Sequence, residues 1–341
     1  MKKDNIILAD CNETEIKDFV DGINHSFNEN KFKCKSYIAN GQRTGIISEI
    51  IRYFKYFMVP FNIMIHRRKY NIIIGWQQFY TLIFCFWCSL FKLKKTNKVI
   101  AINFTYKEKS GLKGKIYKFF MKRCLDSKYL DYIHVPSIEY STIVNKEFGF
   151  PLQNIIVSHF GLNDIYDVYK DAEKPIQEDY FLAIGRSNRD YDFLVNVWKK
   201  IDSKLIIISD VYKNNKKIPN ITIINDISGE KQFPWIVNAK GVVLILKQDD
   251  IPSGDTVLLR AMSFKKIVII NSTSTLAEMY IKNESNGIVI NKNEIELKNA
   301  IDDINNNKYD YIKENARKSF ITNFSRKSMG IKIGEIIKNK K

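Results

Sequence analysis

The chain has 341 residues, 45% of them hydrophobic and 27% charged, a balance that excludes a disordered protein. Its length suits two domains of about 150 residues each. The formal net charge of +17 favours nucleic acid or an anionic membrane as a partner, although the richness in Lys, Asn and Ile also fits a bias in coding composition.

Short, largely β-branched runs alternate with helix-compatible stretches in the first half, for example Glu15 to Asn28 and Leu112 to Leu125. Continuous apolar strands separated by helices are typical of a parallel sheet covered on both faces, so we predict a Rossmann-like domain over residues 1–164. The predicted strands are NIILA, FKCKSYI, NIIIG, KVIAI, DYIHV and NIIVS.

An apolar segment, YNIIIGWQQFYTLIFCFWCSLFKL, has the length of a membrane span. Gly75, Gln77 and Gln78 interrupt it, and a strand followed by a helix from Phe79 explains the pattern without a bilayer. Its Cys85-x-x-Cys88 pair has no second ligand pair nearby, so core packing is favoured over metal or redox chemistry. The five cysteines have no regular disulfide spacing, which indicates a reduced, cytoplasmic setting.

The second half begins with a polar stretch, residues 165–178, which we interpret as a linker. A second alternating set then predicts another Rossmann-like domain over residues 179–310, facing the first across a cleft. Residues 311–341 form a basic, helix-compatible segment that we expect to pack back toward the first domain. The predicted strands are DYFLAIG, SKLIIIS, NITII, GVVLIL and KIVII.

Ser253 and Gly254 lie between the strand GVVLIL and a helix from Asp255. Free N–H groups at a helix N-terminus suit a diphosphate, Gly254 allows close approach, and Ser253 or Thr256 offers a hydroxyl. The alternative is a simple N-cap and turn. A second loop, GRSNRD, follows another strand and carries Arg186 after Gly185 and then Arg189, two guanidiniums that suit a diphosphate clamp.

The runs FLAIGRSNRDYDFLVNVW, SGDTVLLRAMSFKKIVIINS and NGIVI resemble the C-terminal domain of GT-B glycosyltransferases, especially family 4-like enzymes of bacterial surface polysaccharide synthesis. In the first half, IIIGWQQ and DYIHVPSIEYSTIVNKEFGFPLQNIIVSHFGLND are similar to the close of their N-terminal domain. The resemblance implies a nucleotide diphosphate-sugar donor held by the second domain and a glycan or lipid-linked glycan acceptor held by the first. It implies neither an essential metal nor a separate cofactor.

The donor contacts carried over from the resemblance are Arg186, Arg189, Ser253, Gly254 and Thr256. Family 4 enzymes commonly have two glutamates eight positions apart, the second of which binds the ribose, but here Pro252 and Arg260 occupy those positions. Glu278 is an alternative ribose contact, although TLAE also reads as a capping box from Thr275 to Glu278. Further candidates for sugar or hydroxyl contacts are Asp249, Asp250 and Asp255.

The stereochemical outcome stays open, and so does the catalytic base. The resemblance implies retention, whereas inversion needs a base that reaches the acceptor, for which His134, Glu139 and His159 are candidates. A structural role suits each of them better, so no catalytic base is named. Two other functions stay open: a non-hydrolysing nucleotide-sugar epimerase, and a nonenzymatic basic module that binds membrane or nucleic acid.

The first half holds most of the charge excess, 11 in residues 1–170 against 6 in residues 171–341. Its basic runs HRRK, KLKK and KGKIYKFFMKR alternate with apolar and aromatic residues, a mixture that suits an anionic membrane surface. We therefore expect a cytoplasmic protein, peripheral on the inner face of the cell membrane, with a lipid-diphosphate-linked acceptor and no nucleic acid partner.

Overall fold

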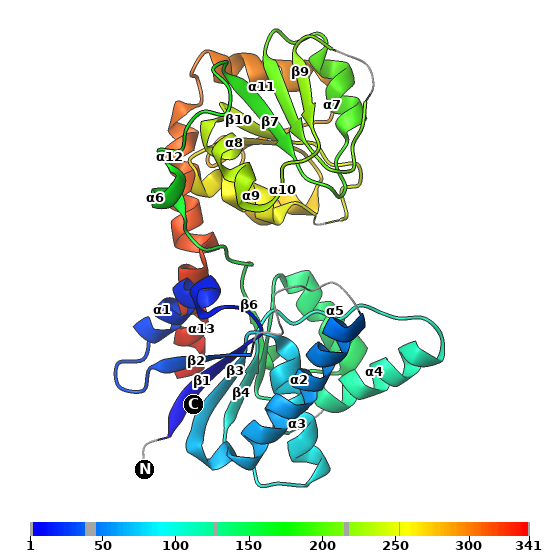
Figure 1. Ribbon diagram of the computed structural model, residues 1–341, viewed down its shortest axis with the longest axis vertical. Helices are drawn as coiled ribbons and strands as arrows, with labels where there is room; N and C mark the ends of the chain where they lie inside the picture. Colours follow the sequence, from blue (N-terminus) through cyan, green and yellow to red (C-terminus); the bar gives the residue numbers. More distant parts are fainter. Residues whose placement is uncertain (1–2, 38–45, 126–127, 215–217, 252, 340–341) are drawn as a thin grey trace. The chain divides into compact units, whose positions relative to one another are not determined.

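A computed structural model describes residues 3–37, 46–125, 128–214, 218–251 and 253–339. The chain divides into two compact units (Figure 1). The first unit comprises Met1–Asn163 and Ser325–Lys341, and the second comprises Asp164–Phe324.

The first unit contains a six-stranded sheet in the order β2-β1-β3-β4-β5-β6, and every pairing is parallel. All six strands expected from the apolar runs are present. The strands are β1 (Asp4–Ala9), β2 (Phe32–Ser36), β3 (Tyr70–Gly75), β4 (Lys98–Ala101), β5 (Tyr132–Val135) and β6 (Ile155–Val157). The α-helices are α1 (Lys17–His25), α2 (Ile46–Ile65), α3 (Gln78–Leu90), α4 (Gly111–Leu125), α5 (Ile138–Phe148) and α13 (Arg326–Asn339). Short 3-10 turns lie at Glu13–Ile16, Arg67–Lys69 and Leu152–Asn154.

Alternating strand residues enter two separate cores on the two faces of this sheet. Ile7 and Ile74 pack in the cluster that contains side chains of α1 and α13. Their neighbours Ile6 and Ile73 pack in the cluster that contains side chains of α2, α3 and α4. Because both faces are covered, the central strands have apolar runs such as Ile72–Ile74, whereas the edge strand β2 also has Lys33 and Lys35.

Glycines let the C-terminal helix α13 pack closely on α1, beside which it lies in Figure 1. A Cβ on Gly330 would lie 2.4 Å from the Phe19 carbonyl oxygen, and one on Gly22 would lie 2.2 Å from the Lys327 carbonyl oxygen. Hydrogen atoms as the only side chains therefore set the distance between these helices. The end of the chain thus completes the first unit.

The second unit repeats the architecture with a parallel sheet in the order β12-β11-β10-β7-β8-β9. The strands are β7 (Tyr180–Ile184), β8 (Lys204–Ile208), β9 (Ile221–Ile224), β10 (Gly241–Leu244), β11 (Ile267–Asn271) and β12 (Ile288–Ile290). The α-helices are α6 (Tyr166–Tyr169), α7 (Tyr191–Trp198), α8 (Phe233–Asn238), α9 (Asp255–Ser263), α10 (Thr275–Tyr280), α11 (Glu294–Asn305) and α12 (Asp310–Ser319). A 3-10 turn lies at Gly229–Gln232 and a π-helical turn at Phe320–Phe324. Trp198 of α7 and Ile301 of α11 pack in one core against strand side chains such as Phe181.

The stretch 165–178, expected as a linker, is part of the second unit. Its helix α6 carries Tyr169, whose ring lies 4.9 Å from the ring of Phe233, and Asn238 donates a hydrogen bond to the carbonyl of Ala172. The second boundary falls after Phe324, fourteen residues beyond the expected 310. Consequently α12 belongs to the second unit, and only α13 returns to the first.

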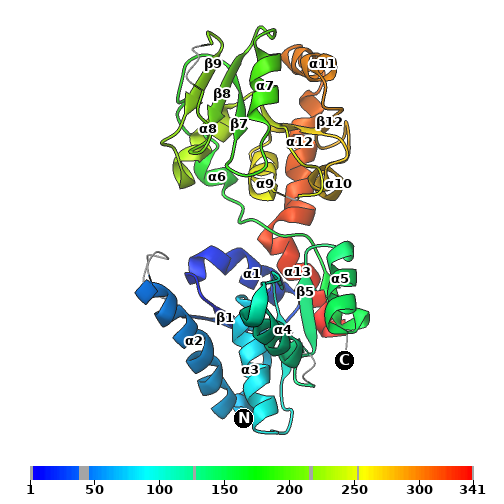
Figure 2. The same cartoon turned by 90° about the vertical axis from the view of Figure 1, so that its right-hand side faces the viewer.

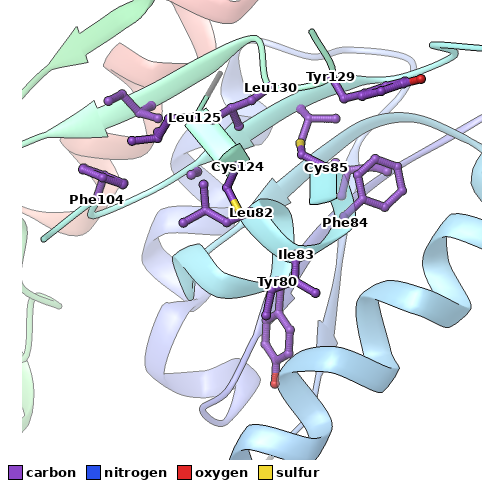
Figure 3. Close-up of a cluster of buried hydrophobic side chains, with 14 of the residues drawn as sticks. Tyr80, Leu82, Ile83, Phe84, Cys85, Phe104, Cys124, Leu125, Tyr129 and Leu130 are labelled. Atoms are coloured by element: carbon purple, nitrogen blue, oxygen red, sulfur yellow. The ribbon is translucent and has the colours of Figure 1, made fainter. Parts of the chain in front are cut away.

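The apolar segment of the first half is a strand followed by a helix, β3 and then α3, as the sequence predicts. Figure 3 shows Cys85 of α3 and Cys124 of α4 among buried apolar side chains. Burial raises the pKa of the Cys85 thiol well above its usual value, and Cys88 is buried in the same core, which confirms the core-packing interpretation. No helix in the described part of the chain combines the length and apolarity that crossing a bilayer requires.

Candidate functional site

Two loops meet at the carboxyl edge of the second sheet because their strands, β7 and β10, are neighbours. Asn188 connects the two loops through hydrogen bonds. Its backbone is in the left-handed conformation, with φ at +56°. Its side-chain amide donates to the carbonyl of Gln248 at 2.7 Å and accepts from the Gln248 N–H at 2.9 Å. The N–H of Asp190 donates to the Ile245 carbonyl at 2.8 Å. The GRSNRD loop is therefore held in register against the loop that precedes α9.

Arg189 lies at the centre of this junction and is only 7% exposed. Its Nε donates to the Ile184 carbonyl at 3.2 Å, and its Nη1 donates to the carbonyls of Ser187 at 2.8 Å and Ser253 at 3.0 Å. These bonds join the end of β7 to the start of α9. They also fix the guanidinium while leaving Nη2 without a hydrogen-bond partner among the described residues.

Among the described residues, no carboxylate forms an ion pair with Arg189. The hydrogen-bond acceptors that it has are neutral carbonyls. Burial lowers the pKa of Arg189, and the fields of Tyr191 and Asp255 oppose that shift. Arginine stays protonated even so. A buried cation of this kind is stabilised when an anion binds beside it.

Two glycines make room for this guanidinium. Gly185 and Gly254 have φ angles of +131° and +123°, values that side chains rarely adopt. A Cβ on Gly185 would lie 2.8 Å from Arg189 Nη2, and one on Gly254 would lie 2.5 Å from the same atom. The two glycines thus allow the arginine side chain to lie against the backbone. From the sequence alone, Gly254 is expected to allow a phosphate to approach the backbone in this way.

The N-terminus of α9 offers N–H groups beside Arg189. Gly254 is the N-cap and contributes no side-chain cap, and the first helical bond runs from the Leu258 N–H to the Gly254 carbonyl at 3.0 Å. The Asp255 carboxylate accepts from the Thr256 N–H at 2.8 Å. Within the described residues, the N–H groups of Asp255 and Val257 have no acceptor. Free donors, a helix dipole and a buried guanidinium therefore converge at one point.

The hydroxyl and carboxylate candidates around this point differ in their contacts. The Ser253 hydroxyl donates to the Ser187 carbonyl at 3.3 Å, and Thr256 is exposed. Asp249 joins two loops, since its carboxylate accepts from Asn271 and from Thr273, each at 2.7 Å. Asp250 is exposed.

Arg186 points away from Arg189. Its side chain is 72% exposed, and its Nε lies 2.9 Å from an Asp210 oxygen at the end of β8. Since β8 and β10 flank β7 on opposite sides, the two arginines contact opposite neighbours. The clamp stays a prediction, and it requires Arg186 to exchange Asp210 for a ligand. Such an exposed ion pair contributes only about 0–1 kcal/mol.

Glu278 lies in α10, and its predicted capping box is wrong. The N-cap is Ser274, whose hydroxyl accepts from the Ala277 N–H at 3.2 Å, so the helix starts one residue earlier than a Thr275 cap requires. Glu278 is exposed and lines a surface hollow of about 280 Å³ with Asn291 and Glu296. Its proposed ribose contact stays a prediction.

Arg260, which occupies the position of the second family 4 glutamate, is buried. Its guanidinium lies 5.1 Å from the ring centre of Phe233 and 5.7 Å from that of Phe264. It therefore packs α9 against α8. Pro252 lies outside the described residues.

The candidate bases of the first unit have structural contacts. His134 is buried, accepts from the Asn103 N–H at 3.2 Å and bonds the Ser158 hydroxyl through Nε2 at 2.9 Å. Burial lowers the pKa of His134 to about 4. Burial also lowers the pKa of His159, and a hydrogen bond from its own backbone N–H lowers the pKa of Glu139. In the described part of the chain, no group of three or more His, Cys, Asp or Glu side chains could hold a metal ion.

Sequence reasoning missed Asn188 and the structural role of Gly185. The sequence did contain a signal for this loop, namely a glycine at 185 and an asparagine at 188. These two residue types adopt positive φ angles most readily. Their spacing around the two arginines marks a sharply folded loop.

Comparison with known proteins identifies the fold. No protein-family model matches the chain, and no curated protein matches it. A glycosyltransferase from Rickettsia africae ESF-5 is 14% identical with a TM-score of 0.65, and the match covers 100% of both chains. HepE of Anabaena in complex with UDP-glucose is 11% identical with a TM-score of 0.59, covering 98% of this chain and 99% of that one. The lipopolysaccharide outer core galactosyltransferase WaaB is 14% identical with a TM-score of 0.62, covering 99% of this chain and 100% of that one. The chain therefore has the GT-B fold, with two Rossmann-like domains.

Proposed function

We propose that the protein is a glycosyltransferase that binds a nucleotide diphosphate-sugar at the carboxyl edge of the second sheet. The observation that carries the proposal is the buried Arg189 guanidinium, which has no acidic partner among the described residues and adjoins free N–H groups of α9. A diphosphate fits this combination of charge and donors. The solved complex of HepE with UDP-glucose, on the same fold, supports the choice of donor.

Sugar transfer requires positive charge beside the departing diphosphate, and Arg189 supplies it at this site. The bond between the anomeric carbon and the diphosphate oxygen breaks, and the acceptor hydroxyl oxygen bonds to that carbon while its proton passes to the departing diphosphate or to a base. Negative charge grows on the departing diphosphate. Arg189 is already fixed by three carbonyl bonds, so it stabilises that charge without rearranging. This positive charge comes from the protein itself, and we propose that no essential metal takes part.

The acceptor proposed for the first unit is a glycan or lipid-diphosphate-linked glycan in surface polysaccharide synthesis. Two solved neighbours have related names, since one is a lipopolysaccharide outer core galactosyltransferase and another is WaaG, a glycosyltransferase involved in lipopolysaccharide biosynthesis. The basic excess of the first half suits an anionic acceptor. Retention or inversion and the catalytic base stay open in this proposal.

Calorimetric titration with nucleotides tests the donor site directly. We expect UDP or GDP to bind more tightly than the matching monophosphate, and Arg189→Ala to weaken the diphosphate by roughly 10- to 150-fold, the equivalent of ~1.5–3 kcal/mol. Arg186→Ala should weaken it too if the clamp forms on binding. Diphosphate affinity that neither variant changes would contradict the site. Interconversion of UDP-sugars without an acceptor would indicate the epimerase instead.

A further inference from the structure

Two helices of the first unit expose apolar stripes. Residues 50, 54 and 58 of α2 recur every four positions, and residues 112, 116 and 119 of α4 recur at intervals of four and three, so each set lies along one side of its helix. Phe119 is 72% exposed and Leu112 is 74% exposed. We call these six exposed side chains the apolar stripes: Ile50, Phe54, Met58, Leu112, Ile116 and Phe119.

The two stripes belong to one layer of helices. Figure 2 shows α2, α3 and α4 beside one another in the first unit. The rings of Phe57 and Phe120 lie 6.4 Å apart and join α2 to α4, while the Trp87 indole N–H donates to the Phe57 carbonyl at 3.1 Å and joins α3 to α2. The inner sides of these helices cover the sheet, so their exposed sides form one outer surface. An apolar surface of this extent marks a binding site more often than a bare monomer face.

Positive charges outnumber negative ones around the stripes, although Glu49 of α2 pairs with Arg52 and Glu147 of α5 pairs with Lys118 of α4. Helix α4 contains five Lys and Arg and no Asp or Glu. Lys113, Lys115 and Lys122 are exposed and form no ion pair with the described residues. The turn after α2 adds Arg67, Arg68 and Lys69.

We infer that this face of α2 and α4 docks on the surface of an anionic lipid bilayer. Apolar and aromatic side chains enter the interface between headgroups and acyl chains, while lysines beside them meet lipid phosphates. A second copy of the chain fits less well, because two copies of a basic face repel each other. Nucleic acid would leave the apolar stripes in water. The inference depends on the first unit alone, so it does not rest on the donor site.

Vesicle cosedimentation of the full chain tests the inference with two independent variants. Vesicles of phosphatidylcholine with phosphatidylglycerol should bind the protein, and those of phosphatidylcholine alone should bind it much more weakly. The doubles Leu112→Ser/Phe119→Ser and Lys113→Glu/Lys115→Glu should each reduce partitioning at least tenfold. A lysine near an anionic surface contributes ~1 kcal/mol, or roughly fivefold. Ile295→Ser, at a side chain of α11 that is also 72% exposed, should have no effect.

The charge variant has its own control, Lys199→Glu/Lys318→Glu, which changes the net charge equally on exposed positions of the second unit. If this control lowers binding as much as the α4 variant, or if lipid charge and salt make no difference, the surface assignment is wrong. Analytical ultracentrifugation of the lipid-free protein supplies a further check. A dimer that dissociates in Leu112→Ser/Phe119→Ser would assign the face to a second copy and overturn the inference. Circular dichroism verifies folding, and if the serine variant unfolds, the exposed lysine variant decides.

Discussion

Replacing Gly254 with alanine tests the packing of Arg189 against a bare backbone. The new Cβ would lie 2.5 Å from Nη2 and 3.0 Å from both Nη1 and Cζ of Arg189. The guanidinium cannot move away freely, because three backbone carbonyls hold it. A strained backbone residue costs ~1–3 kcal/mol, and overpacking costs ~1–3 kcal/mol more. We therefore expect Gly254→Ala to lose about 2–6 kcal/mol of unfolding free energy.

A matched glycine separates these two contributions. Gly229 in the same unit has φ at +59°, and a Cβ there meets no atom of the described residues within 4 Å. Gly229→Ala should therefore lose only the backbone part, ~1–3 kcal/mol. Urea denaturation followed by circular dichroism measures both variants, and titration with UDP measures the binding site. For Gly254→Ala we expect weaker UDP binding, because the displaced guanidinium no longer meets the diphosphate.

A double-mutant cycle provides the decisive result. In an Arg189→Ala background the clash disappears, so Gly254→Ala should lose only the strain. The coupling should therefore exceed the ~0.5 kcal/mol scatter seen for independent sites. Additive losses, or unchanged UDP binding in Gly254→Ala, would refute the argument that these glycines exist to admit Arg189.

Three further changes test other parts of the molecule. Asp255→Asn removes a negative charge beside the free N–H groups of α9, so UDP should bind a few-fold more tightly in titration; weaker binding would mean that the carboxylate holds the ligand. Gly330→Ala forces a Cβ to 2.4 Å from the Phe19 carbonyl and should lose ~1–3 kcal/mol or more in urea, whereas Glu335→Ala on the exposed side of the same helix should lose little. The pKa of His134 is lowered to about 4 in the folded state. Between pH 4 and pH 6.5 the folded protein therefore keeps this histidine neutral, whereas the unfolded chain protonates it. Stability should therefore fall as the pH drops from 6.5 to 4, by roughly 3 kcal/mol from this residue, and His134→Gln should flatten that slope in pH-dependent urea titrations.

The sequence by itself determined the two parallel sheets. A strand buried on both faces must be apolar along most of its length. Runs such as NIIIG and GVVLIL can therefore be recognised as buried strands before it is known which strands pair with them. The same local signal placed Gly254 at the start of a helix and Cys85 in a core. Each of these properties depends on residues adjacent in the chain.

The tertiary structure alone decided which predicted residues meet. Arg186 and Arg189 are three positions apart and look equivalent in sequence, yet one pairs with Asp210 and the other is buried against Gly254. That division depends on β8 and β10 flanking β7, an order set by pairings between residues 24 positions apart for β8 and 60 positions apart for β10. The return of α13 to the first unit depends likewise on glycines more than three hundred positions apart, Gly22 and Gly330. Hydrophobic periodicity records whether an element is buried, but it does not record its partner, because many apolar surfaces offer a similar gain of buried area and only complementary shapes and paired polar groups select among them.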